Sequence, residues 1–193
     1  MAVIKENKHK MKKITTLEME CVLARNFDRR TNLIVPNVSW GMFHYELDLV
    51  VLTPSGYATE IEIKVSKSDL KKDKEKFHNH ENDMIKTLYF AIPEYIDSDF
   101  ALTQIPYHAG LLVVYEVEIG SYQDVKSTEE YSKILSGEIE IPKKIIKRVK
   151  EIKKPVIKNN PYKWNDKERY ELSRLGSLRI WGLKEKLIKG NNK

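Results

Sequence analysis

The stretch from 43 to 65 constrains the fold most strongly, because FHYELDLVVLTPSGYATEIEIKV alternates polar and apolar residues on both sides of a short turn. Successive side chains of a β-strand point to opposite faces, so this alternation predicts two strands with one apolar and one charged face. The charged face of the predicted hairpin carries His44, Glu46, Asp48, Glu60, Glu62 and Lys64. The opposite face is apolar, which indicates that the hairpin packs on at least one side.

The five residues between the two strands, TPSGY, suit a three-residue hairpin loop. Pro54 fixes φ at the first turn position, and Gly56 can adopt the left-handed conformation that closes such loops. The sequence therefore predicts a tight antiparallel hairpin.

Pairing Thr53 with Tyr57 sets a register that places Asp48 opposite Glu62. Side chains that oppose one another across two strands have Cβ atoms about 4.5–5.5 Å apart, where like charges are destabilising. A divalent cation between the two carboxylates turns this repulsion into shared coordination. The alternative is a solvated sheet face with scattered charges, which is what charged positions usually indicate.

The elements around the hairpin predict a mixed α/β fold. Short apolar runs such as TLYFAI and GLLVVYEV are typical of strands covered on both faces. The expected elements are a helix from 15 or 16, an edge strand at 33–38, the hairpin, a helix after 65, strands at 87–92 and 110–117, a helix at 127–135, a strand or basic stripe at 141–158, and a helix at 162–188. No glycine-rich phosphate loop is present, which argues against a dinucleotide-binding fold.

This arrangement resembles the PD-(D/E)XK nuclease superfamily, also called restriction-endonuclease-like. The resemblance lies in Asp48 on one strand and Glu62-Ile63-Lys64 on the next, with Leu47 in the place of the proline, and in the element order from about 15 to 117. The run EIKVSKSDLKKD is similar to small repair-associated or phage-encoded nucleases, including the MmcB-like group. The resemblance implies a mixed central sheet with helices on both faces and a C-terminal helix.

The domain organisation expected from this resemblance is a flexible basic lead-in over 1–14 and a single nuclease-like domain over 15–193. The domain divides into a core over 15–117 and a C-terminal extension over 118–193.

The resemblance also implies a catalytic site. Asp48, Glu62 and the backbone carbonyl of Ile63 are expected to bind one or two Mg²⁺ or Mn²⁺ ions, which lower the pKa of a water and stabilise charge on the phosphate. Lys64 is expected to orient the attacking water or to neutralise the developing negative charge. The register offers an alternative for Lys64, because Glu46 opposes it and suits a plain ion pair.

Glu20 completes the acidic set that the resemblance implies. Thr15 and Glu18 form a capping box at the start of the first helix, so Glu18 has a structural role. Glu20 is expected on or beside the apolar stripe of that helix, which is formed by Leu17, Cys21, Ala24 and either Phe27 or Asp28. The resemblance gives Glu20 a role in holding the metal, and the alternative is a glutamate at the rim paired with a lysine or arginine.

The net charge of +6 favours a polyanionic partner such as nucleic acid. Lys67, Lys71 and Lys72 follow the charged hairpin and suit phosphate contact, although a solvated lysine face is equally consistent with them. Cys21 is the one cysteine, which excludes an internal disulfide and a cysteine zinc site. Tyr162, Trp164 and Trp181 are expected in the core rather than in contact with bases.

The expected function is a Mg²⁺- or Mn²⁺-dependent deoxyribonuclease in DNA repair, recombination or phage DNA processing. Two alternatives stay open, a non-catalytic nucleic-acid-binding module of the same fold and an adaptor without a nucleic-acid role. The charged start MAVIKENKHKMKK is unlike a secretory signal, and no apolar run is long enough to span a membrane, so we expect a cytoplasmic protein that does not bind membranes. Many members of the superfamily pair, which makes a homodimer one expectation.

Overall fold

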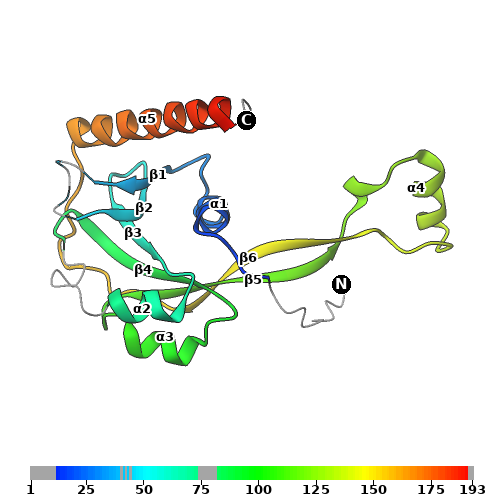
Figure 1. The fold of residues 1–193 in the computed structure, drawn as a ribbon, viewed down its shortest axis with the longest axis horizontal. Helices are drawn as coiled ribbons and strands as arrows, with labels where there is room; N and C mark the ends of the chain where they lie inside the picture. Colours follow the sequence, from blue (N-terminus) through cyan, green and yellow to red (C-terminus); the bar gives the residue numbers. More distant parts are fainter. Residues whose placement is uncertain (1–11, 40, 42, 44, 74–81, 191–193) are drawn as a thin grey trace.

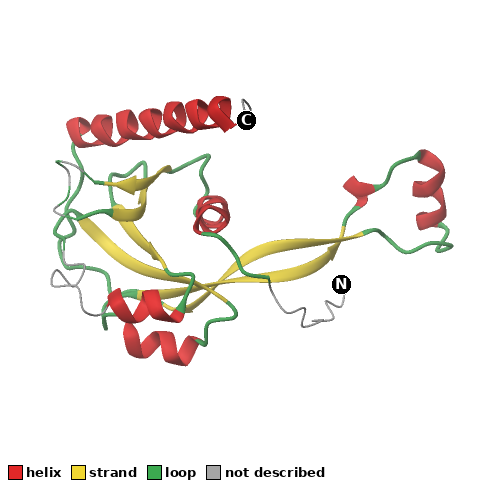
Figure 2. Ribbon diagram, viewed as in Figure 1, coloured by secondary structure: helices red, strands yellow, loops and turns green. Residues whose placement is uncertain are grey.

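The computed structural model describes residues 12–39, 41, 43, 45–73 and 82–190. A six-stranded sheet runs through the molecule, with helices on both of its faces (Figures 1 and 2). In chain order the elements are α1 Thr16–Asn26, β1 Leu33–Val38, β2 Leu47–Leu52, β3 Ala58–Ile63, α2 Lys67–Asp73, β4 Ile85–Pro93, α3 Ser98–Gln104, β5 Gly110–Gly120, the 3₁₀ helix η1 Tyr122–Asp124, α4 Thr128–Leu135, β6 Lys143–Lys153 and α5 Asp166–Gly190.

The strands lie side by side in the order in which they occur in the chain, from β1 to β6. β3, β4 and β5 are parallel to one another, whereas β1–β2, β2–β3 and β5–β6 pair antiparallel. The predicted mixed α/β fold, with helices on both faces and a C-terminal helix, is therefore confirmed. Because β3, β4 and β5 run in the same direction, their carboxyl ends lie at the same end of the sheet.

The central hairpin has the predicted turn and register. The Thr53 amide donates to the Tyr57 carbonyl at 3.0 Å, and Gly56 adopts φ +89°. Leu52 pairs with Ala58 and Leu49 with Ile61, which is the register that brings Asp48 next to Glu62. The first strand is shorter than predicted, because β2 begins at Leu47 rather than near 43.

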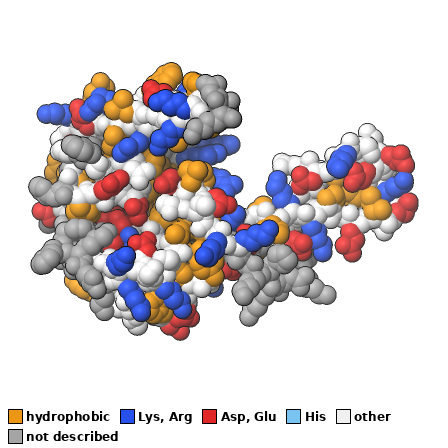
Figure 3. All heavy atoms as spheres, viewed as in Figure 1, with side chains coloured by type: hydrophobic (Ala, Val, Ile, Leu, Met, Phe, Trp, Pro, Cys, Tyr) orange, Lys and Arg blue, Asp and Glu red, His pale blue; other side chains and the backbone are white. Residues whose placement is uncertain are grey.

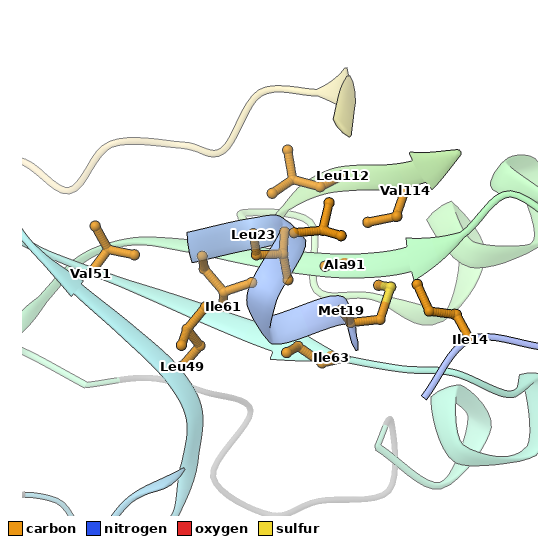
Figure 4. Packing of buried hydrophobic residues seen from close by; sticks show 11 residues of the cluster. Ile14, Met19, Leu23, Leu49, Val51, Ile61, Ile63, Ala91, Leu112 and Val114 are labelled. Carbon is orange, nitrogen blue, oxygen red and sulfur yellow. The ribbon is translucent and has the colours of Figure 1, made fainter. Parts of the chain in front are cut away.

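One face of the sheet, which we call the α1 face, packs against helix α1. Met19 and Leu23 of α1 point onto apolar side chains of the strands, as Figure 4 shows for Leu49, Ile61 and Ile63. The predicted apolar stripe of this helix was wrong at Leu17 and Cys21, whereas Phe27 packs partly buried against the same core, as predicted. Met19, Val22 and Leu23 are buried, whereas Leu17 is 60% exposed and Cys21 is exposed.

The opposite face, which we call the α2–α3 face, carries Glu60, Glu62 and Phe90, since paired residues on neighbouring strands share a face. Two separate apolar clusters cover it. Leu70 of α2 and Ala101 of α3 pack over β4 and β5, and Trp164 with Leu172 packs over β1 and β2. The charged residues of β3 lie between these clusters, so the face predicted to be charged is covered by helices rather than open to water.

β5 and β6 continue beyond the rest of the sheet as a twisted two-stranded ribbon, which carries η1 and α4 at its far end (Figure 1). β4 last pairs with β5 at Pro93 and Val114, whereas β5 and β6 stay paired out to Gly120 and Lys143. The strand expected at 110–117 is thus longer than predicted, and only its first half is buried. The stretch 141–158, for which a strand and a basic stripe were both considered, contains strand β6.

Helix α5 lies against β1 as far as Arg179, whose guanidinium donates to the Asn37 carbonyl of β1. Leu172 is fully buried. The backbone approaches β1 closely at Gly176, because a Cβ atom at this position would lie 3.2 Å from Val35 Cγ2. The prediction that Trp164 is a core residue is confirmed. For Tyr162 and Trp181 it was wrong, because these side chains are 41% and 59% exposed. None of the helices within the described residues is both long and apolar enough to cross a bilayer.

Candidate active site

The charged residues of the central hairpin gather at the carboxyl end of β3, on the α2–α3 face. Glu62 and Lys64 are almost fully buried there, with side-chain exposures of 1% and 5%. Asp48 of β2 is 32% exposed and lies on the solvent side of the group. The hairpin therefore brings together three of the four residues predicted to be catalytic, Asp48, Glu62 and Lys64, with Asp48 open to solvent.

Asp48 is held by the backbone of the neighbouring strand. The β2–β3 pairing that begins at the turn extends to Leu49 and Ile61. Beyond it, the Ile63 amide donates to Asp48 Oδ2 at 2.8 Å. The backbone amide of Ile63 thus fixes the carboxylate beside Glu62, whereas the metal-binding role expected for the Ile63 carbonyl stays a prediction.

The Lys64 ammonium is the centre of this group. Its Nζ lies 2.8 Å from Glu62 Oε2, 2.9 Å from Asp73 Oδ1 and 3.9 Å from Asp48 Oδ2. We refer to Asp48, Glu62, Lys64 and Asp73 as the Lys64 cluster. Burial disfavours the charged form of Lys64, but the three carboxylates, Glu62 first among them, outweigh it and hold the pKa of Lys64 above its ordinary value.

Asp73 is a member of the cluster that the sequence reasoning missed. It lies at the last position of α2 and is 6% exposed. A signal was present, because Asp73 follows Leu70 by three residues, and residues three apart share a helix face. Leu70 is fully buried on the sheet, so a carboxylate one turn later is directed at the sheet as well.

Two other charged residues of the hairpin, Glu60 and Glu46, are not part of the Lys64 cluster. Glu60 is fully buried and accepts a hydrogen bond from the Tyr45 hydroxyl at 3.1 Å. Glu46 is exposed and precedes β2, so the predicted alternative of a Glu46–Lys64 ion pair was wrong. Lys64 is instead engaged by Glu62 and Asp73. His44 lies outside the described residues.

Glu20 of α1 approaches the cluster from the other side of the hairpin. It is half-buried, and burial together with the negative charge of Asp48 raises its pKa above the ordinary value. The charge effect shows that the two carboxylates are close enough to repel one another. Glu18, in contrast, closes the predicted capping box, with its Oε2 accepting from the Thr15 amide at 2.9 Å.

The lysines predicted to contact phosphate lie on α2, next to the cluster. Lys67, Lys71 and Lys72 are all exposed. The ammonium groups of Lys67 and Lys71 lie 5.3 and 5.7 Å from the centre of the Phe100 ring, which directs both toward α3. Residues 74–81, which include further lysines and two histidines, lie outside the described residues.

The donor atoms of the cluster fit a hard divalent cation. Asp48 and Glu62 offer carboxylate oxygens from adjacent strands, the ligand type that Mg²⁺ and Mn²⁺ prefer. Among the described residues, no group of three or more His, Cys, Asp and Glu side chains is arranged to hold a metal. Mg²⁺ is nonetheless commonly bound through one or two carboxylates with water at its other positions, so two carboxylates are a sufficient protein contribution.

A separate cavity of about 400 Å³ lies at the other end of the sheet. Ile85 and Leu88, at the amino end of β4, line it together with His108 and Lys158. β3 and β4 are parallel, with Ile85 next to Ala58 and Ala91 next to Ile63. The residues that line the cavity lie at the amino end of β4 and do not include any member of the Lys64 cluster, so the cavity is not part of the candidate active site.

Comparison with known proteins identifies a solved structure with a similar fold, and that protein is of unknown function. No family model and no curated protein matches the chain. Among solved structures, the chain is similar to the SPO1766 protein of unknown function from Silicibacter pomeroyi, with a TM-score of 0.52 and 12% sequence identity. The match covers 96% of this chain and 97% of that protein. At this identity the likeness concerns the fold alone.

Proposed function

We propose that the protein is a divalent-cation-dependent nuclease that hydrolyses phosphodiester bonds in DNA, with the Lys64 cluster as its active site. The observation that carries this proposal is the convergence of Asp48 and Glu62, from adjacent strands, on the ammonium group of Lys64. Two carboxylates and a protonated amine, of which Asp48 reaches solvent, are groups that metal-dependent phosphodiester hydrolysis can use. The resemblance to PD-(D/E)XK nucleases supports the same assignment.

In this proposal, Asp48 and Glu62 hold Mg²⁺ or Mn²⁺ together with the Ile63 carbonyl, and Glu20 adds a further carboxylate. The bound cation supplies positive charge that acidifies a water and offsets charge on the phosphate. The Ile63 amide keeps the Asp48 carboxylate in place, so the ligand does not reorganise when a cation binds. The neighbouring exposed face of Asp48 is where a phosphate enters.

The raised pKa of Lys64 argues against a role as general base. An amine whose pKa lies above its ordinary value is protonated at neutral pH and cannot accept a proton from water. It can donate hydrogen bonds and stabilise negative charge. Lys64 therefore orients the attacking water and stabilises the developing charge, while Asp73 and Glu62 hold its ammonium in position.

Cleavage of supercoiled, linear and branched DNA with Mg²⁺ or Mn²⁺ tests the proposal, using Asp48→Asn as the decisive variant. The asparagine keeps an oxygen that accepts from the Ile63 amide but removes the charge. We expect at least about a hundredfold slower cleavage, as for loss of one charge-stabilising group. Glu46→Gln, at an exposed acid two residues earlier, is the matched control and should cleave normally. Equal cleavage by the wild type and both variants would show that the activity arises elsewhere.

The competing function is a non-catalytic DNA-binding module, and one observation favours it. The Lys64 ammonium is already engaged by Glu62 and Asp73 in a buried position, which is consistent with a purely structural ion-pair network. DNA binding without cleavage, under every cation and substrate tested, would select this alternative.

A further inference from the structure

We propose that the β5–β6 ribbon binds the sugar-phosphate backbone of duplex DNA through one row of cations, formed by Lys144, Arg148 and Lys150. This inference extends the proposed function, from which it takes the chemical class of the ligand. We refer to these three residues as the basic row. All three are exposed on β6.

The register of the ribbon separates its cations into two faces. Residues paired across the strands share a face, so Arg148 lies with Tyr115 and Lys150 with Val113, while Lys147 lies with Glu116. Arg148 and Lys150 therefore belong to the α2–α3 face and Lys147 to the α1 face. Lys144, paired with Ile119, lies four residues from Arg148 and shares its face.

The two faces differ in how their charges are balanced. On the α1 face, Lys147 lies 3.6 Å from Glu116 and 3.3 Å from Glu18, and Lys143 lies 3.7 Å from Glu118. On the α2–α3 face, the cross-strand neighbours of the basic row are Ile119, Tyr115 and Val113. Within the described part of the chain, no carboxylate forms an ion pair with a member of the basic row. As far as the described residues show, the α2–α3 face of the ribbon thus offers cations that a phosphate can take without displacing an acid.

The basic row continues the face and the end of the sheet at which the Lys64 cluster lies. Glu62 pairs with Phe90, and Phe90 with Leu111, which precedes Val113 by two residues on the same face. The ribbon also leaves the sheet beyond Pro93 and Val114, at the carboxyl ends of the parallel strands. A duplex held along the ribbon therefore lies at the same end of the sheet as the cluster, next to α2 and α3, which cover β4 and β5 on this face.

The lobe at the far end of the ribbon limits where the duplex lies. Residues 121–142, which include η1 and α4, contain five acidic residues and two lysines, whereas β6 contains six basic residues and one glutamate. Acidic side chains are spread over this lobe in Figure 3. Phosphates are repelled by the lobe and attracted by the shaft. From Val114 to Gly120 the shaft extends about 20 Å, since a strand rises about 3.4 Å per residue, and such a ribbon is narrow enough to lie in or along a DNA groove.

The test is the salt dependence of binding to a short fluorescein-labelled DNA duplex, measured by anisotropy in EDTA between about 50 and 200 mM NaCl. The variant Lys144→Gln/Arg148→Gln/Lys150→Gln removes the basic row. The variant Lys133→Gln/Lys143→Gln/Lys147→Gln removes three cations that have carboxylate partners, and so changes the net charge equally.

Loss of the basic row is expected to weaken binding and to reduce the slope of log K against log salt by about 2.7, because each duplex phosphate contact contributes about 0.9. Arg148→Gln alone should reduce the slope by about 0.9. The control variant should leave the slope within about 0.9 of the wild type. Equal slopes for the two triple variants, or no binding by the wild type at the lowest salt, would overturn the inference.

This measurement is independent of catalysis, because EDTA removes divalent cations. A salt slope that depends on the basic row supports the inference even if no DNA is cut. The absence of cleavage would count only against the proposed nuclease activity. Cleavage that depends on Asp48, in a protein whose two triple variants bind DNA equally, would remove the inference and leave the proposed function standing.

Discussion

The Lys64 cluster and the basic row of the ribbon begin from similar sequence patterns and end in opposite environments. EIEIK on β3 and KIIKRVK on β6 both combine charged and apolar positions in a strand. Glu62 and Lys64 are nearly inaccessible to water, whereas Lys144, Arg148 and Lys150 are exposed. Both groups lie on the same face of the same sheet, and the difference is that α2 and α3 cover the first and nothing described covers the second. A charged strand face therefore does not by itself indicate exposure.

The largest contrast is expected from removing one cation from each region. Lys64→Ala leaves buried carboxylates without the ammonium, and breaking a buried ion pair in this way costs about 3–5 kcal/mol. Arg148→Ala, at an exposed site, should change the free energy of unfolding by no more than about 0.5 kcal/mol. Urea unfolding of the two variants measures this difference. Equal costs would show that burial does not distinguish the two regions.

A second contrast concerns the layer that covers the cluster. Leu70 of α2 is fully buried over the sheet, so Leu70→Ala should cost about 2–5 kcal/mol of unfolding free energy. Leu135, at the end of α4 on the ribbon lobe, is 67% exposed. Leu135→Ala is expected to stay within about 0.5 kcal/mol of the wild type by the same measurement. A small effect at Leu70 would mean that α2 does not seal the cluster.

Removing a carboxylate charge should also cost more unfolding free energy in the Lys64 cluster than in the ribbon. Asp73→Asn weakens one charge-assisted bond to the buried Lys64 and is expected to cost about 1.5–3 kcal/mol. Glu118→Gln breaks its ion pair with Lys143, where both side chains are about half exposed, and should cost at most about 1 kcal/mol. Thermal unfolding of both variants, together with urea titration, compares them. If Glu118→Gln were the more damaging change, the ribbon would depend on its ion pairs more than the cluster does.

The smallest effects are expected from two glutamates of α1, one near each region. Their pKa values are shifted in opposite directions. Burial and Asp48 raise the pKa of Glu20, so its ionisation opposes folding once the pH exceeds its ordinary value. Thr15 and Lys147 of the ribbon lower the pKa of Glu18, so its ionisation favours folding in the same range.

Glu20→Gln is therefore expected to raise the melting temperature at pH 7, in the absence of divalent cations, and to lose this effect below about pH 4. Glu18→Gln is expected to lower the melting temperature at pH 7, with the same loss in acid. Melting curves across this pH range measure both. A destabilising Glu20→Gln at neutral pH would show that Asp48 does not act on Glu20.

Local pattern was sufficient to predict most of the helices and strands and the hairpin register. Alternation, the turn at Pro54 and Gly56, and the apolar runs of β4 and β5 each depend on neighbours in sequence. The register followed from one turn, because antiparallel pairing propagates from its closing residues. Asp48 and Glu62 could therefore be placed side by side without a structure.

Local pattern could not predict how the helices pack on the sheet or where the sheet narrows to the ribbon. The apolar stripe of α1 was misplaced by two residues because Leu17 and Cys21 have the same spacing as Met19 and Leu23, and only the sheet determines which set is buried. Asp73 was missed because its position depends on how α2 packs on β3. The ribbon was not predicted, because nothing in the sequence of β5 marks Val114 as its last residue paired with β4.

Binding of Mn²⁺ to the protein, followed by electron paramagnetic resonance in the wild type, Asp48→Asn and Glu46→Gln, tests the central claim most directly. The account predicts that the wild type and Glu46→Gln bind Mn²⁺ alike and that Asp48→Asn loses most of the affinity, because Asp48 and Glu62 share the cation. Undiminished binding by Asp48→Asn, or no binding by the wild type, would contradict a metal site at the Lys64 cluster.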